Sequence, residues 1–144
     1  MSSMIHLTDD MRERLASALA DRSPVVAASV DSDGQPHLSF YGTTQVYGPG
    51  QLAIWVRDPA SSFMQRIAGN PHVAFMYRNA AERVMYQFHG QARLVADEEV
   101  RQHVFDHSPE VERGLDPDRL GVAVLIDVDQ VKGRLLGEAV EMHR

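Results

Sequence analysis

The sequence of 144 residues contains no cysteine, is short of basic residues and has no long hydrophobic run. The absence of cysteine excludes disulfides, iron–sulfur clusters, thiolate zinc sites and thiol nucleophiles. Fourteen lysines and arginines against twenty aspartates and glutamates give a formal net charge of −6, which argues against a nucleic-acid-binding face. No apolar stretch approaches the ~20 residues that a membrane-spanning helix needs.

The start of the chain lacks a basic region followed by an apolar one, so we expect no secretory signal. We therefore predict a cytoplasmic protein with neither a membrane nor nucleic acid among its partners. Hydrophobic residues make up 44% of the chain and charged residues 24%, which is an ordinary globular composition. A chain of this length fits one domain, and we expect that domain to span residues 1–144.

Capping signals and apolar periodicity predict three helices. Thr8 is a suitable N-cap for the first helix, and Asp58 followed by Pro59 is a suitable start for the second. A polar loop is expected over residues 108–119. The predicted helices cover residues 9–21, 59–69 and 97–107.

Short β-branched and aromatic runs between turn sequences predict strands, with Gly90 as a bulge or a close backbone approach. Strict alternation of strands and helices is missing, so a doubly wound parallel sheet is not expected. The pattern predicts a mainly β fold, a six- to seven-stranded antiparallel barrel with about three helices at its ends. The predicted strands cover residues 25–30, 36–47, 51–57, 73–77, 83–95, 122–128 and, for the seventh, 131–142.

Five short motifs occur in a characteristic order: DGQPHLS, WVRDP, NPHVA, FHGQARLV and IDVDQV, starting at residues 33, 55, 70, 88 and 126. Together they resemble the pyridoxamine 5′-phosphate oxidase-like, FMN-binding split-barrel family over nearly the whole chain. The resemblance implies a six-stranded split barrel and a homodimer with two equivalent cofactor sites between the subunits. It also implies FMN as the cofactor, or the deazaflavin F420 or haem as in some branches, while the fold alone does not choose the reaction.

The phosphate end of FMN needs a cation or free N–H groups. By the resemblance, the position of a lysine common in flavin-binding relatives holds Phe63, and a nearby position that is often arginine holds Ser61. Arg57 and the hydroxyls of Ser61 and Ser62 are the candidate replacements. In the alternative interpretation, Asp58 only caps the second helix and Arg57 pairs with it.

The isoalloxazine ring of a flavin needs a slot of backbone groups and apolar or aromatic walls. Period two places Ser39, Tyr41 and Thr43 on one face of the second predicted strand, although an exposed strand face explains them equally well. Core packing is the alternative for Trp55, and Gln87 is placed to reach across a dimer groove. The candidates for the ring site are Ser39, Tyr41, Thr43, Trp55, Val56 and Gln87.

Histidine spacing gives little support for a metal site. His103 and His107 are four residues apart, but no third ligand is evident, so we expect solvent-facing histidines and no bound metal. His37, His72 and His89 each offer a single axial ligand for haem.

The favoured hypothesis is an FMN-dependent oxidoreductase acting on an unidentified small molecule, with no catalytic acid or base assigned. The alternatives are an F420-dependent reductase of the same fold and a non-catalytic, haem-binding module with a degenerate flavin site.

Overall fold

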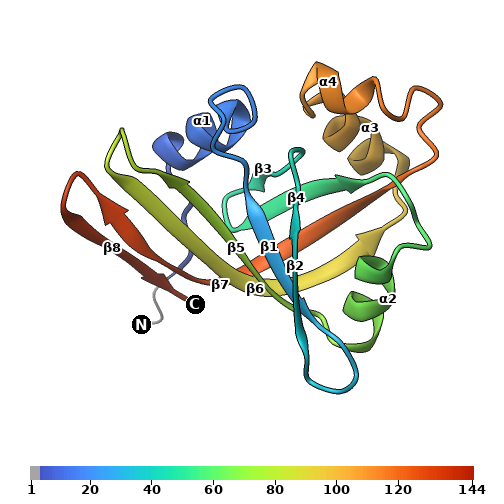
Figure 1. The fold of residues 1–144 in the computed structure, drawn as a ribbon, viewed down its shortest axis with the longest axis horizontal. Coiled ribbons are helices and arrows are strands. Elements are labelled where there is room, and N and C mark those ends of the chain that lie inside the picture. The colour runs from blue at the N-terminus through green and yellow to red at the C-terminus, as the bar shows by residue number, and fades with distance from the viewer. Residues whose placement is uncertain (1–3) are drawn as a thin grey trace.

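A computed structural model describes residues 4–144 of the chain. Within this range the chain forms eight strands and four short helices (Figure 1). The helices are α1 (Asp9–Ser17), α2 (Ser62–Gly69), α3 (Glu98–Asp106) and α4 (Glu110–Arg113). The strands are β1 (Val26–Val30), β2 (Pro36–Phe40), β3 (Gln45–Gly48), β4 (Gln51–Val56), β5 (His72–Asn79), β6 (Val84–Val95), β7 (Val122–Leu135) and β8 (Glu138–His143).

All strands belong to one antiparallel sheet, as the sequence predicts. Its order is β2-β1-β5-β6-β7-β4-β3, with β8 added to β7. β2 and β3 stand at the two ends of this order and do not pair with each other, so the curved sheet does not close. α1, α3 and α4 lie at one end of the sheet, whereas α2 lies beside the β1–β2 hairpin toward the other end (Figure 1).

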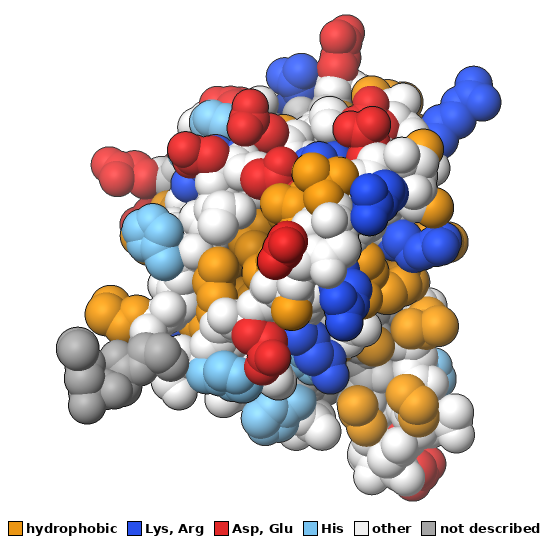
Figure 2. All heavy atoms as spheres, turned by 90° about the vertical axis from the view of Figure 1, so that its left-hand side faces the viewer, with side chains coloured by type: hydrophobic (Ala, Val, Ile, Leu, Met, Phe, Trp, Pro, Cys, Tyr) orange, Lys and Arg blue, Asp and Glu red, His pale blue; other side chains and the backbone are white. Residues whose placement is uncertain are grey.

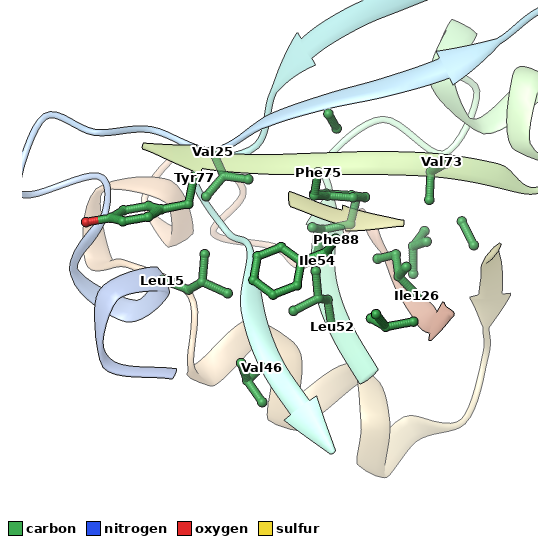
Figure 3. Close-up of a cluster of buried hydrophobic side chains, with 14 of the residues drawn as sticks. Leu15, Val25, Val46, Leu52, Ile54, Val73, Phe75, Tyr77, Phe88 and Ile126 are labelled. Carbon is green, nitrogen blue, oxygen red and sulfur yellow. The ribbon is translucent and has the colours of Figure 1, made fainter. Parts of the chain in front are cut away.

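The main hydrophobic core lies inside the curve of the sheet (Figure 3). Alternate residues of β5 and β6 point into it, and the side chains of Phe75, Tyr77, Tyr86 and Phe88 are almost completely buried. Met11 of α1 covers one end of the same cluster. This alternation is the period-two pattern of a sheet with one packed face, which is why these two strands are predicted correctly.

The predicted start of α2 is wrong. The helix begins at Ser62, with Ser61 as N-cap, whose hydroxyl accepts a hydrogen bond from the Met64 N–H at 3.4 Å. The carboxylate of Asp58 instead accepts from the Ala60 N–H at 2.9 Å. Asp58-Pro59 therefore forms a turn ahead of the helix, because an aspartate side chain satisfies a turn as readily as a helix start. The first helix also ends earlier than predicted, at Ser17 rather than near Asp21.

Three of the predicted strands, those at 36–47, 122–128 and 131–142, divide differently in the structure. The predicted strand 36–47 is broken at residues 41–44, where the Thr44 N–H donates to the Tyr41 carbonyl at 3.3 Å and the chain turns from β2 into β3. The predicted sixth strand continues without a break through Leu135, and only then does Leu136-Gly137 turn the chain into β8. Inside the predicted loop 108–119 the structure forms α4.

The prediction for Gly90 is confirmed. The pairing of β6 with β7 shifts register between His89 and Gly90, and a Cβ atom at Gly90 would lie 2.2 Å from the Asp127 carbonyl oxygen. Only glycine allows such a close backbone approach.

Across residues 4–144, none of the helices combines the length and the apolar character needed to cross a membrane.

Candidate functional site

A hollow of about 400 Å³ lies where the turn after β2 meets the end of β4, the start of α2 and the helix α4. We call it the cofactor groove, after the cofactor site that the resemblance implies for these residues. It brings together five of the nine side chains selected from the sequence: Tyr41, Trp55, Val56, Arg57 and Ser61. Phe40, Gly42, Asp58 and Glu112 also line it.

Tyr41 forms the aromatic wall of the cofactor groove. Its ring lies 4.9 Å from that of Phe63, centroid to centroid. Burial raises the pKa of the Tyr41 hydroxyl to about 12, although the positive charge of Arg66 opposes this shift. The hydroxyl is therefore neutral at physiological pH and can donate a hydrogen bond to a ligand.

Phe63, at the position where the resemblance implies a lysine, belongs to the core. It is only 3% exposed and lies on the inner face of α2 with Met64 and Ile67. The side chain packs against the back of Tyr41 instead of offering a charge to the groove. Any anionic group bound in the groove must be held by other residues.

The charges around the cofactor groove are mixed. Arg57 is exposed, and within residues 4–144 it forms no ion pair with Asp58, so the interpretation that these two neighbours pair is wrong. Glu112 reaches in from α4, and its Oε2 would lie 3.0 Å from a Cβ atom at Gly42. The groove lining thus carries one arginine and two carboxylates.

Trp55 is fixed behind the cofactor groove. It is 3% exposed, and its Nε1 donates to the Asp116 carboxylate at 2.9 Å. The guanidinium of Arg101 lies 5.3 Å above the indole ring, and Phe105 meets the ring edge to face at 5.2 Å. Most of the Trp55 side chain is therefore packed in the core, as the alternative interpretation predicts. It supports the groove from behind and offers little surface to a ligand.

Asp116 is a buried carboxylate held in its ionised form. Burial would raise the pKa of Asp116, but hydrogen bonds from Trp55 and from the Leu120 and Gly121 N–H groups, together with the nearby Arg57, hold it below its usual value. The sequence analysis missed Asp116, since it contacts Trp55 across 61 positions of the chain.

The other four candidates lie outside the cofactor groove. Ser39 and Thr43 do not share a strand face with Tyr41, because β2 ends at Phe40. Thr43 is buried, and its hydroxyl accepts from the Trp55 N–H at 2.9 Å and donates to the Trp55 carbonyl at 3.1 Å. It shapes the groove without facing it.

Gln87 and Ser62 point elsewhere. Gln87 alternates with the buried Tyr86 and Phe88, so it faces the outer side of the sheet, where its Oε1 lies 3.3 Å from Nε2 of His89. Ser62 lines a different hollow, on the other side of α2. Within one chain, therefore, neither contacts a ligand in the cofactor groove.

Two of the histidines lie next to each other at the end of α3, but within residues 4–144 they belong to no metal-binding cluster. His103 and His107 stack with ring centroids 3.9 Å apart, and His107 Nδ1 lies 2.8 Å from the His103 carbonyl oxygen. Across residues 4–144, no group of three or more histidine and acidic side chains is arranged to hold a metal ion. His89, the histidine beside Gln87, has a pKa lowered by burial and by the charge of Lys132.

The antiparallel split barrel with a groove beside its open edge defines the class of fold. The sequence model of the family described as pyridoxamine 5′-phosphate oxidase matches residues 11–132. The chain belongs to this family. Among curated protein sequences, none matches the chain.

Solved structures share the fold at low sequence identity. The HupZ protein of Group A Streptococcus superposes with a TM-score of 0.72 at 13% identity, covering 93% of this chain and 98% of that one. A NimC/NimA family protein from Clostridium acetobutylicum gives 0.71 at 18% identity, covering 92% of each chain. An FMN-binding protein from Syntrophomonas wolfei gives 0.68 at 9% identity, covering 88% of each. At these identities the likeness supports the fold alone.

Proposed function

We propose that the chain acts as one split-barrel domain over residues 1–144, binds FMN in the cofactor groove and is an FMN-dependent oxidoreductase for a small molecule. The observation that carries this proposal is that Tyr41, Val56, Arg57 and Ser61 meet in one groove of a chain that belongs to the pyridoxamine 5′-phosphate oxidase family. The FMN-binding protein from Syntrophomonas wolfei, which has the same fold, adds support.

The residues of the groove suit the two ends of FMN differently. Tyr41 and Val56 offer an aromatic and an aliphatic wall for the ring, with Trp55 keeping the back of the slot rigid. Arg57 is the one cation of the lining, and with the Ser61 hydroxyl it would hold the phosphate. Bound FMN would supply the hydride chemistry, while the chain positions the ring and limits the access of water.

The charges favour FMN over F420. F420 has a polyanionic tail, and the groove opposes its single arginine with Asp58 and Glu112. Repulsion from two carboxylates disfavours every additional negative charge on a ligand.

Removing the charge of Arg57 is expected to weaken FMN binding. For Arg57→Ala we expect a loss of about 1.5–3 kcal/mol, or roughly 10- to 150-fold in Kd, because a charge-assisted hydrogen bond to the phosphate is lost. Titration of FMN, followed by quenching of its fluorescence, measures this change. Arg12→Ala, which removes an equal charge from α1 outside the groove, is the control. Equal Kd values for the wild type and Arg57→Ala contradict the assignment of Arg57.

We further propose that the protein is a homodimer that associates through the outer face of β2, β1 and β5. Leu38 and Phe40 on this face are 73% and 71% exposed, and Met76 follows in the same register row as Phe40. Phe40 also lines the cofactor groove, so the groove opens toward this face. Figure 2, which views the molecule from the left-hand side of Figure 1, shows a row of basic side chains with hydrophobic side chains beside it. A partner on this face would bring Gln87 of the partner subunit toward the groove.

Light scattering tests this arrangement. The wild type is expected at twice the chain mass of 16.1 kDa, and Leu38→Asp at the monomer mass, because a buried, unpaired charge disrupts an apolar interface. Leu136→Asp changes a leucine with 61% exposure in the β7–β8 turn and should remain dimeric. A monomeric wild type refutes the composite site. The predicted cytoplasmic location stays a prediction.

A further inference from the structure

A second hollow, of about 510 Å³, lies between the β1–β2 hairpin and α2. The two elements lie side by side at the lower end of the molecule in Figure 1. The hollow has no lining residue in common with the cofactor groove. Ser62 lines this hollow, whereas its neighbour Ser61 lines the cofactor groove. We call it the hairpin pocket. It is lined by Val30, Asp31, Ser32, His37, Ser62, Gln65, Arg66, Gly69 and Asn70.

Arg66 supplies a fixed positive charge to the hairpin pocket. Its side chain is partly buried, and Nε donates to the Ser29 hydroxyl at 2.7 Å. Ser29 is itself only 1% exposed, so its buried hydroxyl holds the guanidinium of Arg66 in place. Within residues 4–144, no carboxylate pairs with Arg66, and its terminal nitrogens donate to no other side chain or backbone group. The fork of terminal N–H groups is therefore available to a ligand.

The carboxylate of Asp31 is the one acidic group of the pocket, and its oxygens are already engaged. Oδ1 accepts from the N–H groups of Asp33 and Gln35, each at 2.9 Å, and Oδ2 lies 2.9 Å from Nε2 of His37. The bond to His37 and those from the turn hold the pKa of Asp31 below its usual value. Asp31 thus fixes the imidazole of His37 beside the pocket.

Three polar groups complete the lining with free donors. The hydroxyls of Ser32 and Ser62 make no hydrogen bond within residues 4–144. Asn70 accepts from the His72 N–H through Oδ1 at 3.1 Å, which leaves its NH₂ group free to donate. Ser62 and Arg66 are four residues apart on α2, so they project from the same side of the helix.

We propose that the hairpin pocket is a second ligand site, distinct from the cofactor groove, that binds a small phosphomonoester. The guanidinium of Arg66 would take two phosphate oxygens through its fork, a geometry that arginine offers to phosphate. The Ser62 hydroxyl and the His37 ring stand at the same pocket for the remaining oxygen. The organic part of the ligand would extend along Val30 and Gly69, where the lining is apolar.

Calorimetric titration at low ionic strength tests the proposal with two probes, inorganic phosphate and phenyl phosphate. We expect both to bind the wild type, phenyl phosphate more tightly, and Arg66→Gln to weaken both by about tenfold or more. Arg66→Lys keeps the charge but loses the fork, so it is expected to bind with intermediate affinity and guards against misfolding of the glutamine variant. Ser62→Ala should weaken binding less than Arg66→Gln. Arg78→Gln removes an equal charge from an exposed position of β5 outside both hollows, and this matched control should bind as the wild type does.

Several results overturn the proposal. The first is the absence of binding at millimolar concentrations. The second is a loss of binding in Arg57→Gln, a change in the cofactor groove, but not in Arg66→Gln. The third is that benzoate binds as tightly as phenyl phosphate. The titration is repeated on protein saturated with FMN. Unchanged phosphate binding supports two separate sites, whereas displacement by FMN would make the pocket part of the flavin site and overturn the claim of a second one. The first titration contains no flavin, so the loss of binding expected for Arg66→Gln does not depend on whether FMN binds.

Discussion

Replacing Asp116 by alanine is expected to lower the free energy of unfolding by about 3 kcal/mol. The carboxylate accepts three hydrogen bonds of 2.9 Å, from Trp55 Nε1 and from the N–H groups of Leu120 and Gly121. Its removal leaves the indole N–H and the Gly121 N–H buried without an acceptor. Urea unfolding followed by the fluorescence of Trp55, the single tryptophan, measures the loss.

The control for this variant lies in the same loop. Asp118 is exposed, and Asp118→Ala should change the free energy of unfolding by no more than about 0.5 kcal/mol. Equal stabilities of the two variants contradict the role assigned to the Asp116 hydrogen bonds.

Because of the Asp116 carboxylate, we expect the free energy of unfolding to depend on pH. The pKa of Asp116 is lower in the folded protein than its ordinary value of 3.8, so the folded state binds its proton less readily than the unfolded state. Its stabilisation is fully present above pH 3.8 and is lost as the pH falls through the lower folded value. The difference in stability between the wild type and Asp116→Ala should therefore shrink on acidification below pH 3.8. Asp31, Asp127 and Glu98, whose pKa values are also lowered, affect both proteins equally.

Phe63→Ala is expected to cost about 3–5 kcal/mol, because a large aromatic side chain is removed from a packed core. Phe63 is 3% exposed and supports the ring of Tyr41, so FMN binding should also weaken as the wall of the cofactor groove loosens. Chemical denaturation and FMN titration measure the two effects. Gln65→Ala, an exposed change on the same helix, should leave the free energy of unfolding nearly unchanged.

Introducing the lysine that the resemblance implies at residue 63 tests whether this position faces the core or a ligand. Phe63→Lys is expected to destabilise the protein without improving the Kd for FMN, because the side chain at this position points into the core. A stable Phe63→Lys variant that binds FMN more tightly than the wild type would show that the position faces the ligand.

Much of the fold could be predicted from the sequence where the signal is local. The alternation of buried residues in β5 and β6 and the bulge at Gly90 follow from period two and from backbone crowding. The start of α2 could not, since Asp58 and Ser61 carry equally good capping signals and only the turn of Asp58 with Ala60 decides between them. The break after β2 has no local signal either: a Cβ atom at Gly42 would lie 3.1 Å from Leu19 and 3.0 Å from Glu112, which are distant in sequence.

Some residues of the candidate site could likewise be predicted from the sequence, and others could not. Tyr41, Arg57 and Ser61 could be selected because the motifs around them resemble a family. Asp116 and Glu112 could not, since they come from the segment expected to be a loop. Arg66 and His37 line the same pocket only because the β1–β2 hairpin folds against α2. Their spacing along the chain does not predict this proximity.

The absorption spectrum of the purified protein, after loading with FMN and desalting, tests the central claim most directly. Parallel samples are loaded with F420 and with haem. We predict that flavin absorption is retained in the FMN sample, at close to one flavin per chain, and that F420 and haem are removed by desalting. Retention of F420 or haem in place of FMN, or loss of all three, would contradict the proposal that the cofactor groove binds FMN.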